Sequence, residues 1–345
     1  QAYTEKALAS GLQKSGATHG SVIVMDPQSG KVMAMANLPT YKPAEFTKVT
    51  DAEAFNNSVI TKPYEPGSDI KTFTVATGLD KGVIQPTSTY VNTDKITVED
   101  RTITNATKGE TGTITMQTAL NYSLNTGMVT VAQRLGDGNN ITQGARNSLY
   151  DYFHNRFGFG QKTGIELAGE QGGIVIAPDQ VEGNAVRYSN MTFGQGMDLT
   201  MIQVASAFGA LVNGGTYYYP TVIAGTVNDD GELTADTPKA PRTGVISADT
   251  SSKIHEMIHT ARATFYAKND KQGYDIGGKT GTSQTIENGK YVDNQTIGTY
   301  LGYGGDSAAR YVIMVEVSGK GLNLQGNKDA MPIFTDISNW MIDYL

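Results

Sequence analysis

The apolar positions of this chain follow a strand-like period near both ends and a helical period between them. Near the N-terminus, residues 21–26 and 31–37 form two apolar, β-rich runs around Pro27-Gln-Ser-Gly30, and this pattern predicts a hairpin. Similar runs near the C-terminus predict three further strands, at 275–286, 296–303 and 311–317. Asn288-Gly289, after the first of these runs, is typical of a hairpin turn.

Helical patterns predict the remaining elements. They occupy 3–12, parts of 68–213, 246–265 and 329–345. Strand-rich ends around a helix-rich middle predict an α+β fold in which one sheet joins both ends of the chain. We expect residues 20–345 to form one domain and residues 1–19 to be the tail of an upstream element.

Composition narrows the function classes. The chain has 345 residues, a net charge of −7 and no cysteine. The negative charge argues against nucleic acid as a partner. The lack of cysteine excludes disulfides, thiolate nucleophiles and cysteine zinc sites. Apolar stretches are too short to span a bilayer, and the chain begins at Gln1, so we expect a piece of a longer protein.

Tyr64-Glu-Pro-Gly-Ser68-Asp-Ile-Lys71 is the first candidate for chemistry. Pro66-Gly67 predicts a turn, and a helix after it would place Ser68 at a helix N-terminus, which favours developing negative charge. Lys71 would lie one turn on, on the same face. A serine nucleophile needs a base, and a lysine can serve if its surroundings hold it neutral. An ordinary N-cap serine remains the alternative.

Two further segments carry candidate residues. Ser123-Leu-Asn125 combines a hydroxyl that could relay a proton with an amide that could bind a substrate amide, although it also fits a plain polar loop. Gly277-Gly-Lys279-Thr-Gly-Thr282 fits a strand on which Lys279 and Gly281 share one face, with Thr280 and Thr282 on the other. Lys279 would supply a cation for a carboxylate, and Gly281 would let a ligand approach the backbone.

In this order, Ser-x-x-Lys, Ser-x-Asn and Lys-Thr-Gly resemble the motifs of the penicillin-recognising serine transferases. Three longer stretches resemble class B penicillin-binding transpeptidase domains, namely 20–41, 157–167 and 193–203. The resemblance runs from about residue 20 to the C-terminus. It implies an antiparallel sheet flanked by helices on both faces, as in β-lactamases and transpeptidases.

The resemblance also implies roles for the catalytic residues. Ser68 would be the nucleophile and Lys71 its base. Ser123 would relay protons to the leaving amine and from the incoming one. Lys279 would tune Ser123 electrostatically. The backbone N–H groups of Ser68 and Thr282 would form the oxyanion hole.

The same resemblance implies a substrate-binding set of Asn125, Thr280, Gly281 and Thr282. Asn125 would bind the substrate amide, and the two threonines would hold the terminal carboxylate of the donor peptide. No cofactor or metal is implied. One residue departs from the family pattern, because Asp69 follows the nucleophile where relatives more often have a small or apolar residue. An anion there would raise the pKa of Lys71 unless Asp69 points outward.

Two other motifs compete with this interpretation. Gly273 to Thr280 fits the P-loop pattern, but the preceding segment is polar and the following one reads as strand. His255-Glu-Met-Ile-His259 fits a zinc-protease motif. Ile254, Met257, Ile258 and Ala261 predict the buried stripe of a surface helix there, which the histidines would flank. A second Lys-Thr-Gly, at 162–164, is interpreted as a structural turn.

The resemblance therefore predicts a D,D-transpeptidase that cross-links peptidoglycan stem peptides ending in D-Ala-D-Ala and is acylated by β-lactams. Other cell-wall synthesis proteins would be its partners, and nucleic acid would not. It would act at the extracytoplasmic face of a bacterial membrane, anchored by an N-terminal segment absent from this chain. A D,D-carboxypeptidase, a β-lactamase and a non-catalytic β-lactam sensor domain remain alternatives.

Overall fold

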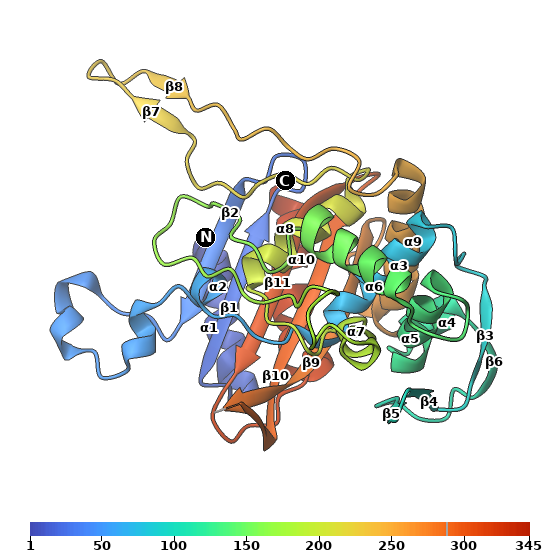
Figure 1. Cartoon of the computed structure of the whole chain (residues 1–345). Helices are drawn as coiled ribbons and strands as arrows, with labels where there is room; N and C mark the ends of the chain where they lie inside the picture. The colour runs from blue at the N-terminus through green and yellow to red at the C-terminus, as the bar shows by residue number, and fades with distance from the viewer. Residues whose placement is uncertain (288) are drawn as a thin grey trace.

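A five-stranded antiparallel sheet forms the centre of the computed structural model, which describes residues 1–287 and 289–345 (Figure 1). The strand order is β2-β1-β11-β10-β9, so the first hairpin pairs with the last strand of the chain. The strands are β1 (His19–Met25), β2 (Val32–Leu38), β9 (Asp275–Glu287), β10 (Lys290–Gly305) and β11 (Ala309–Ser318). The predicted sheet that joins both ends of the chain is confirmed.

Helices cover both faces of this sheet, as predicted. The α-helices of the described residues are α1 (Ala2–Ser15), α2 (Ser58–Thr61), α3 (Lys71–Asp80), α4 (Met116–Asn121), α5 (Asn125–Leu135), α6 (Gln143–Tyr150), α7 (Ala185–Met191), α8 (Met201–Val212), α9 (Ala248–Tyr266) and α10 (Met331–Tyr344), and not all of them contact the sheet. Three small two-stranded ribbons lie outside the main sheet, β3 (Thr89–Asn92) with β6 (Gly112–Thr115), β4 (Lys95–Val98) with β5 (Arg101–Thr104), and β7 (Gly225–Val227) with β8 (Leu233–Ala235).

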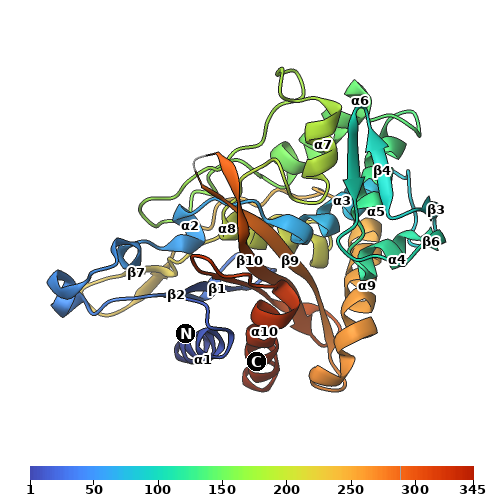
Figure 2. The ribbon, with the colours of Figure 1, turned by 90° about the horizontal axis from the view of Figure 1, so that it is seen from below.

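Helices α1 and α10 lie side by side on one face of the sheet (Figure 2). The rings of Tyr3 and Trp340 stack at 4.5 Å, and Gly11 lies against Ile333 so closely that a side chain there would overlap it. Residues on β11 are buried almost without interruption, because this central strand has a covered face on each side. The domain boundary at residue 20 stays a prediction. Helix α1, which precedes that boundary, packs on the same apolar cluster as α10.

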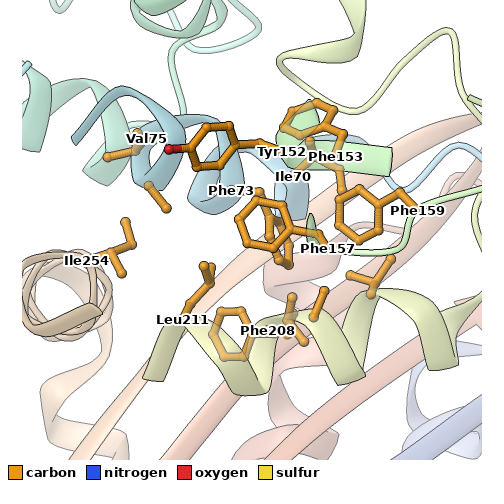
Figure 3. Packing of buried hydrophobic residues seen from close by; sticks show 14 of the residues in the cluster. Ile70, Phe73, Val75, Tyr152, Phe153, Phe157, Phe159, Phe208, Leu211 and Ile254 are labelled. Carbon is orange, nitrogen blue, oxygen red and sulfur yellow. The ribbon is translucent and has the colours of Figure 1, made fainter. Parts of the chain in front are cut away.

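The other face of the sheet carries the helices that hold the candidate site. Helix α3 is buried from Lys71 to Leu79, and its Phe73 lies at the centre of an aromatic cluster (Figure 3). The Phe73 ring lies 5.2 Å from that of Phe157 and 5.0 Å from that of Phe159, both in edge-to-face geometry. Such contacts stabilise ring pairs beyond their buried area. The packing therefore fixes the position of the helix that follows Ser68.

Most predicted boundaries agree with the structure to within a few residues. The helix predicted at 246–265 is α9, and the closing helix begins as a π-helical turn, Gly326–Ala330, before α10. The predicted turn Asn288-Gly289 includes residue 288, which lies outside the described residues. In the part of the chain that the structure describes, every helix is too short or too polar to cross a membrane.

Candidate active site

The turn that carries Ser68 is formed by glycine and leads directly into a helix. Ser68 lies in a 3₁₀ turn, Gly67–Ile70, which continues without a break into α3, whose first residue is Lys71. Gly67 has a φ of +64°, and a Cβ atom there would lie 2.9 Å from the carbonyl oxygen of Thr282. The turn therefore needs glycine both for its backbone angle and for its approach to β9. The predicted place of Ser68 at a helix N-terminus is confirmed.

A second glycine, Gly194, contacts the backbone of this turn and supports it. The N–H of Gly67 donates a hydrogen bond of 3.0 Å to the carbonyl oxygen of Gly194, and Gly194 has a φ of +83°. Two residues on, the N–H of Gly196 donates to Glu65 at 2.7 Å. Residues 193–203 carry part of the resemblance, but the sequence alone predicts no such supporting role for them. The signal was present in the two glycines, which permit a close approach between backbones.

Three stretches that are distant in sequence meet at Ser123. Lys71 Nζ donates to the Ser123 carbonyl oxygen at 2.5 Å and to Ser123 Oγ at 3.1 Å, while Lys279 Nζ donates to the same Oγ at 2.9 Å. Ser123 has a φ of +58°, an unusual angle for a residue with a side chain. In the described part of the chain, the hydrogen bonds of Lys71 go to Ser123 and not to the hydroxyl of Ser68. Bonds of this kind often tighten only when substrate binds.

Burial prepares the two lysines for different tasks. Both side chains are almost fully buried. Burial, and then the charge of Lys279, lower the pKa of Lys71 well below its ordinary value of 10.5. Burial also lowers the pKa of Lys279, to about 8, although the charge of Asp69 opposes that shift. Lys71 is therefore the lysine better suited to accept a proton, and Lys279 the one better suited to remain a cation.

Asp69 points into the protein, where it contacts the sheet. Its side chain is fully buried, and its Oδ2 accepts a hydrogen bond of 2.6 Å from Thr299 Oγ1 on β10. The sequence predicts either an outward side chain or an anion that raises the pKa of Lys71, and the structure gives neither. Burial raises the pKa of Asp69 to about 7, while Thr299 and the charge of Lys279 oppose the shift.

Strand β9 forms the edge of the sheet next to this turn. The predicted alternation is confirmed, since Lys279 and Gly281 are buried while Thr282 is exposed and Thr280 partly so. Thr280 Oγ1 accepts from Lys279 Nζ at 3.3 Å, and Thr282 Oγ1 accepts from the N–H of Gly326 at 3.2 Å. Gly281 was expected to admit a ligand, but the protein itself fills the place of its missing side chain.

The comparisons with known proteins agree with this geometry. The model of the penicillin binding protein transpeptidase domain matches residues 20–339. The chain belongs to this family. It is 31% identical over 320 residues to stage V sporulation protein D of Bacillus subtilis, which covers 91% of the chain and 48% of that protein. It is 28% identical over 350 residues to the probable peptidoglycan D,D-transpeptidase PenA of Neisseria flavescens, covering 100% of the chain and 80% of PenA.

Solved structures show the same fold for the transpeptidase domain. Penicillin binding protein 3 from Mycobacterium tuberculosis, complexed with aztreonam, superposes with a TM-score of 0.87 at 27% identity, over 100% of this chain and 77% of that one. The resemblance to class B penicillin-binding proteins is therefore confirmed. The chain spans about half the length of the Bacillus relative and of the M. tuberculosis relative PbpB, at 48% and 50%.

A cavity beside Ser123 and Lys279 adjoins the candidate site. It has a volume of about 370 Å³ and is bounded by Ser123, Lys279 and Thr280, with aromatic side chains from α9 and from the loop after α4. Asn125 begins α5, and its Nδ2 donates to the carbonyl oxygen of Thr104 at 2.9 Å. That bond fixes the orientation of the Asn125 side-chain amide, two residues after Ser123.

The competing motifs have structural explanations in this domain. The segment that fits the P-loop pattern opens strand β9, whereas a P-loop leads into a helix. In the second Lys-Thr-Gly, Thr163 donates to Glu170 through both its N–H, at 2.7 Å, and its hydroxyl, at 2.6 Å. These bonds give this copy a structural role, although residues 162–164 form an irregular segment rather than the predicted turn.

The histidine pair of α9 is bound to a carboxylate. His255 Nε2 lies 2.6 Å and His259 Nδ1 2.8 Å from the oxygens of Asp275, at the start of β9. The predicted stripe of Ile254, Met257, Ile258 and Ala261 is buried. Within residues 1–287 and 289–345, no group of three or more side chains is arranged to hold a metal ion.

Proposed function

We propose that this domain is a serine acyl transferase, a peptidoglycan D,D-transpeptidase that forms its acyl-enzyme on Ser68 and is acylated there by β-lactams. One observation carries the proposal: Lys71, three residues after the serine at a helix N-terminus, and Lys279 converge on the hydroxyl of Ser123. A neutral lysine, a cationic lysine and two hydroxyls meet the needs of acyl transfer. Family membership supports the same reaction.

In the first step, Ser68 Oγ attacks the carbonyl carbon between the two D-alanines, and its proton passes to the neutral amine of Lys71. The oxyanion lies between the backbone N–H groups of Ser68 and Thr282, each of which lowers the barrier by about 3 kcal/mol. The C–N bond then breaks, and the leaving amine of D-alanine takes a proton relayed through Ser123. Placing Ser68 at the start of α3 also favours the developing charge.

In the second step, an amine of a neighbouring stem peptide attacks the ester carbonyl. It loses its proton through Ser123, and Ser68 Oγ leaves with a proton returned from Lys71. Lys279 stays charged beside Ser123 throughout, and Asn125, Thr280 and Thr282 position the donor peptide. We place this activity on the extracytoplasmic face of a bacterial membrane, together with other cell-wall synthesis proteins.

Covalent labelling tests the proposal. Intact-mass spectrometry with and without penicillin should show one adduct on the wild type and none on Ser68→Ala. Ser252→Ala is a matched control, because Ser252 is an exposed serine on α9, and it should label normally. Undiminished labelling of Ser68→Ala would refute the assigned nucleophile. Release of the adduct within seconds would instead identify a β-lactamase.

A further inference from the structure

The carboxylate of Asp69, at a variable position of the Ser-x-x-Lys motif, lies directly under Gly281 of the Lys-Thr-Gly strand. If Gly281 carried a Cβ atom, it would lie 2.1 Å from Thr299 Oγ1 and 2.8 Å from Asp69 Oδ2. Thr299 lies opposite Gly281 in the register of β9 and β10. The glycine therefore leaves room for a hydrogen-bonded pair, the carboxylate of Asp69 and the hydroxyl of Thr299.

Asp69 has little compensation for its burial apart from a lysine. Thr299 satisfies Oδ2, but Oδ1 is buried and accepts no hydrogen bond from the described residues. An unpaired buried carboxylate is costly unless a cation lies nearby. Lys279 is two residues from Gly281 on the same face of β9. The Lys279 side chain therefore starts about 7 Å along the strand from Gly281, under which Asp69 lies.

Other ionisable groups also face this carboxylate. Tyr64 precedes the nucleophile turn, and burial followed by the charges of Asp69 and Glu316 raises its pKa well above 10. Glu316 lies opposite Thr299 on β11, on the same face of the sheet. Neither can neutralise an anion, because one is a phenol and the other a second carboxyl group. The charge partner of Asp69 is therefore Lys279.

We propose that Asp69 is a positioning residue for acyl transfer, whose buried carboxylate beneath Gly281 holds Lys279 as an ammonium ion on the hydroxyl of Ser123. The inference rests on the proposed function and deepens it. The family motif supplies the lysine, and in this chain the residue after the nucleophile keeps that lysine charged.

The pH dependence follows from the signs of the two shifts. Lys279 has a pKa of about 8, lowered by burial and supported by Asp69, so the ammonium is lost as the pH rises through 8. Without the carboxylate this pKa falls further, by about 1 unit for one nearby opposite charge. Asp69 itself has a pKa of about 7, so at pH 6 it is mostly protonated in the wild type. Replacement by asparagine then changes little at pH 6.

Asp69→Asn tests this inference, with the rate of acylation by a fluorescent penicillin measured from pH 5.5 to 9. The variant and the wild type should react at similar rates at pH 6. At pH 8 the variant should be about fivefold slower, because about a tenth rather than half of Lys279 stays charged. The alkaline limb should move down by about 1 unit, while the acid side of the profile should remain in place.

Glu316→Gln is a matched control. This substitution also removes a buried carboxyl group on the same face of the sheet. The charge of Glu316 acts on the pKa of Tyr64 and not on that of Lys279. Its alkaline limb should coincide with that of the wild type. If Asp69→Asn does not fold, Thr299→Val provides the test, because loss of the hydrogen bond raises the pKa of Asp69 and should shift the limb in the same direction by a smaller amount.

Two results would overturn the inference. One is a uniform loss of rate at every pH in Asp69→Asn, which would mean a purely structural role. The other is an unchanged alkaline limb in Asp69→Asn. If Asp69→Asn does not fold, an unchanged alkaline limb in Thr299→Val would overturn the inference in the same way. Failure of the proposed function would look different, since the wild type would then form no adduct at any pH.

Discussion

Replacing Gly194 by alanine would place a methyl group against the backbone of Gly67, in the turn that carries Ser68. The new Cβ atom would lie 1.9 Å from the carbonyl oxygen of Gly67 and 2.6 Å from its N and C atoms. No rotation of a side chain can relieve this overlap, because the atoms belong to main chain. Reaching ordinary contact would require one segment to move by about 1.5 Å. The turn that carries Ser68 must therefore shift.

Two terms contribute to the expected loss of stability. The φ of +83° at Gly194 costs an alanine about 1 kcal/mol. The displacement adds about 1–3 kcal/mol, the usual range for overpacking a close-packed interior. The free energy of unfolding should therefore fall by about 2–4 kcal/mol. Because a misplacement of about 1 Å can cost about 100-fold in rate, acylation of Ser68 should slow by about that factor.

Gly164 offers a matched control. It has the same φ, +83°, but a Cβ atom there would meet no other atom within 4 Å. Gly164→Ala should therefore cost about 1 kcal/mol and leave acylation unchanged. Urea unfolding would give the stabilities, and stopped-flow labelling with a fluorescent penicillin would give the rates. The comparison separates backbone strain at the substituted glycine from displacement of Ser68.

The reasoning would be refuted if folded Gly194→Ala reacted with penicillin as fast as Gly164→Ala. That result would mean that the turn at Ser68 is positioned without the support of Gly194. Equal losses of stability in the two variants would likewise show that the overlap of the new methyl group with Gly67 carries no cost.

Two further predictions concern stability. Arg262→Ala should lower the free energy of unfolding by about 3–5 kcal/mol, because this fully buried guanidinium donates two hydrogen bonds to Asp270, which would be left unpaired; a loss below about 1 kcal/mol in urea unfolding would contradict this. Asp80→Asn should cost about 1–3 kcal/mol at pH 7. Burial by itself would raise the pKa of Asp80, but hydrogen bonds, first from Tyr152 and then from Ser247, lower this pKa below 3.8. The contribution of ionised Asp80 to stability is therefore present above pH 3.8 and is lost as the pH falls through the lower pKa of the folded state. The difference in urea midpoint between Asp80→Asn and the wild type should persist down to about pH 4. A difference that vanished at pH 6 would contradict the assignment.

Local patterns in the sequence were sufficient for the strands of the main sheet and for helix α9, but not for the three small ribbons. Alternation predicted which residues of β9 are buried, and the stripe from Ile254 to Ala261 predicted the buried face of α9. The order of the three motifs placed Ser68, Ser123 and Lys279 in one family pattern. These features depend on period and spacing, which neighbouring residues carry by themselves.

Only the tertiary structure decided how those residues meet. The bond of Lys71 to Ser123, the inward direction of Asp69 and the support of Gly67 by Gly194 each join segments that are far apart in the chain. The physical reason is packing. Which side chain fills a gap, and which charge offsets the cost of its burial, is set by the surfaces that helices and strands present to one another.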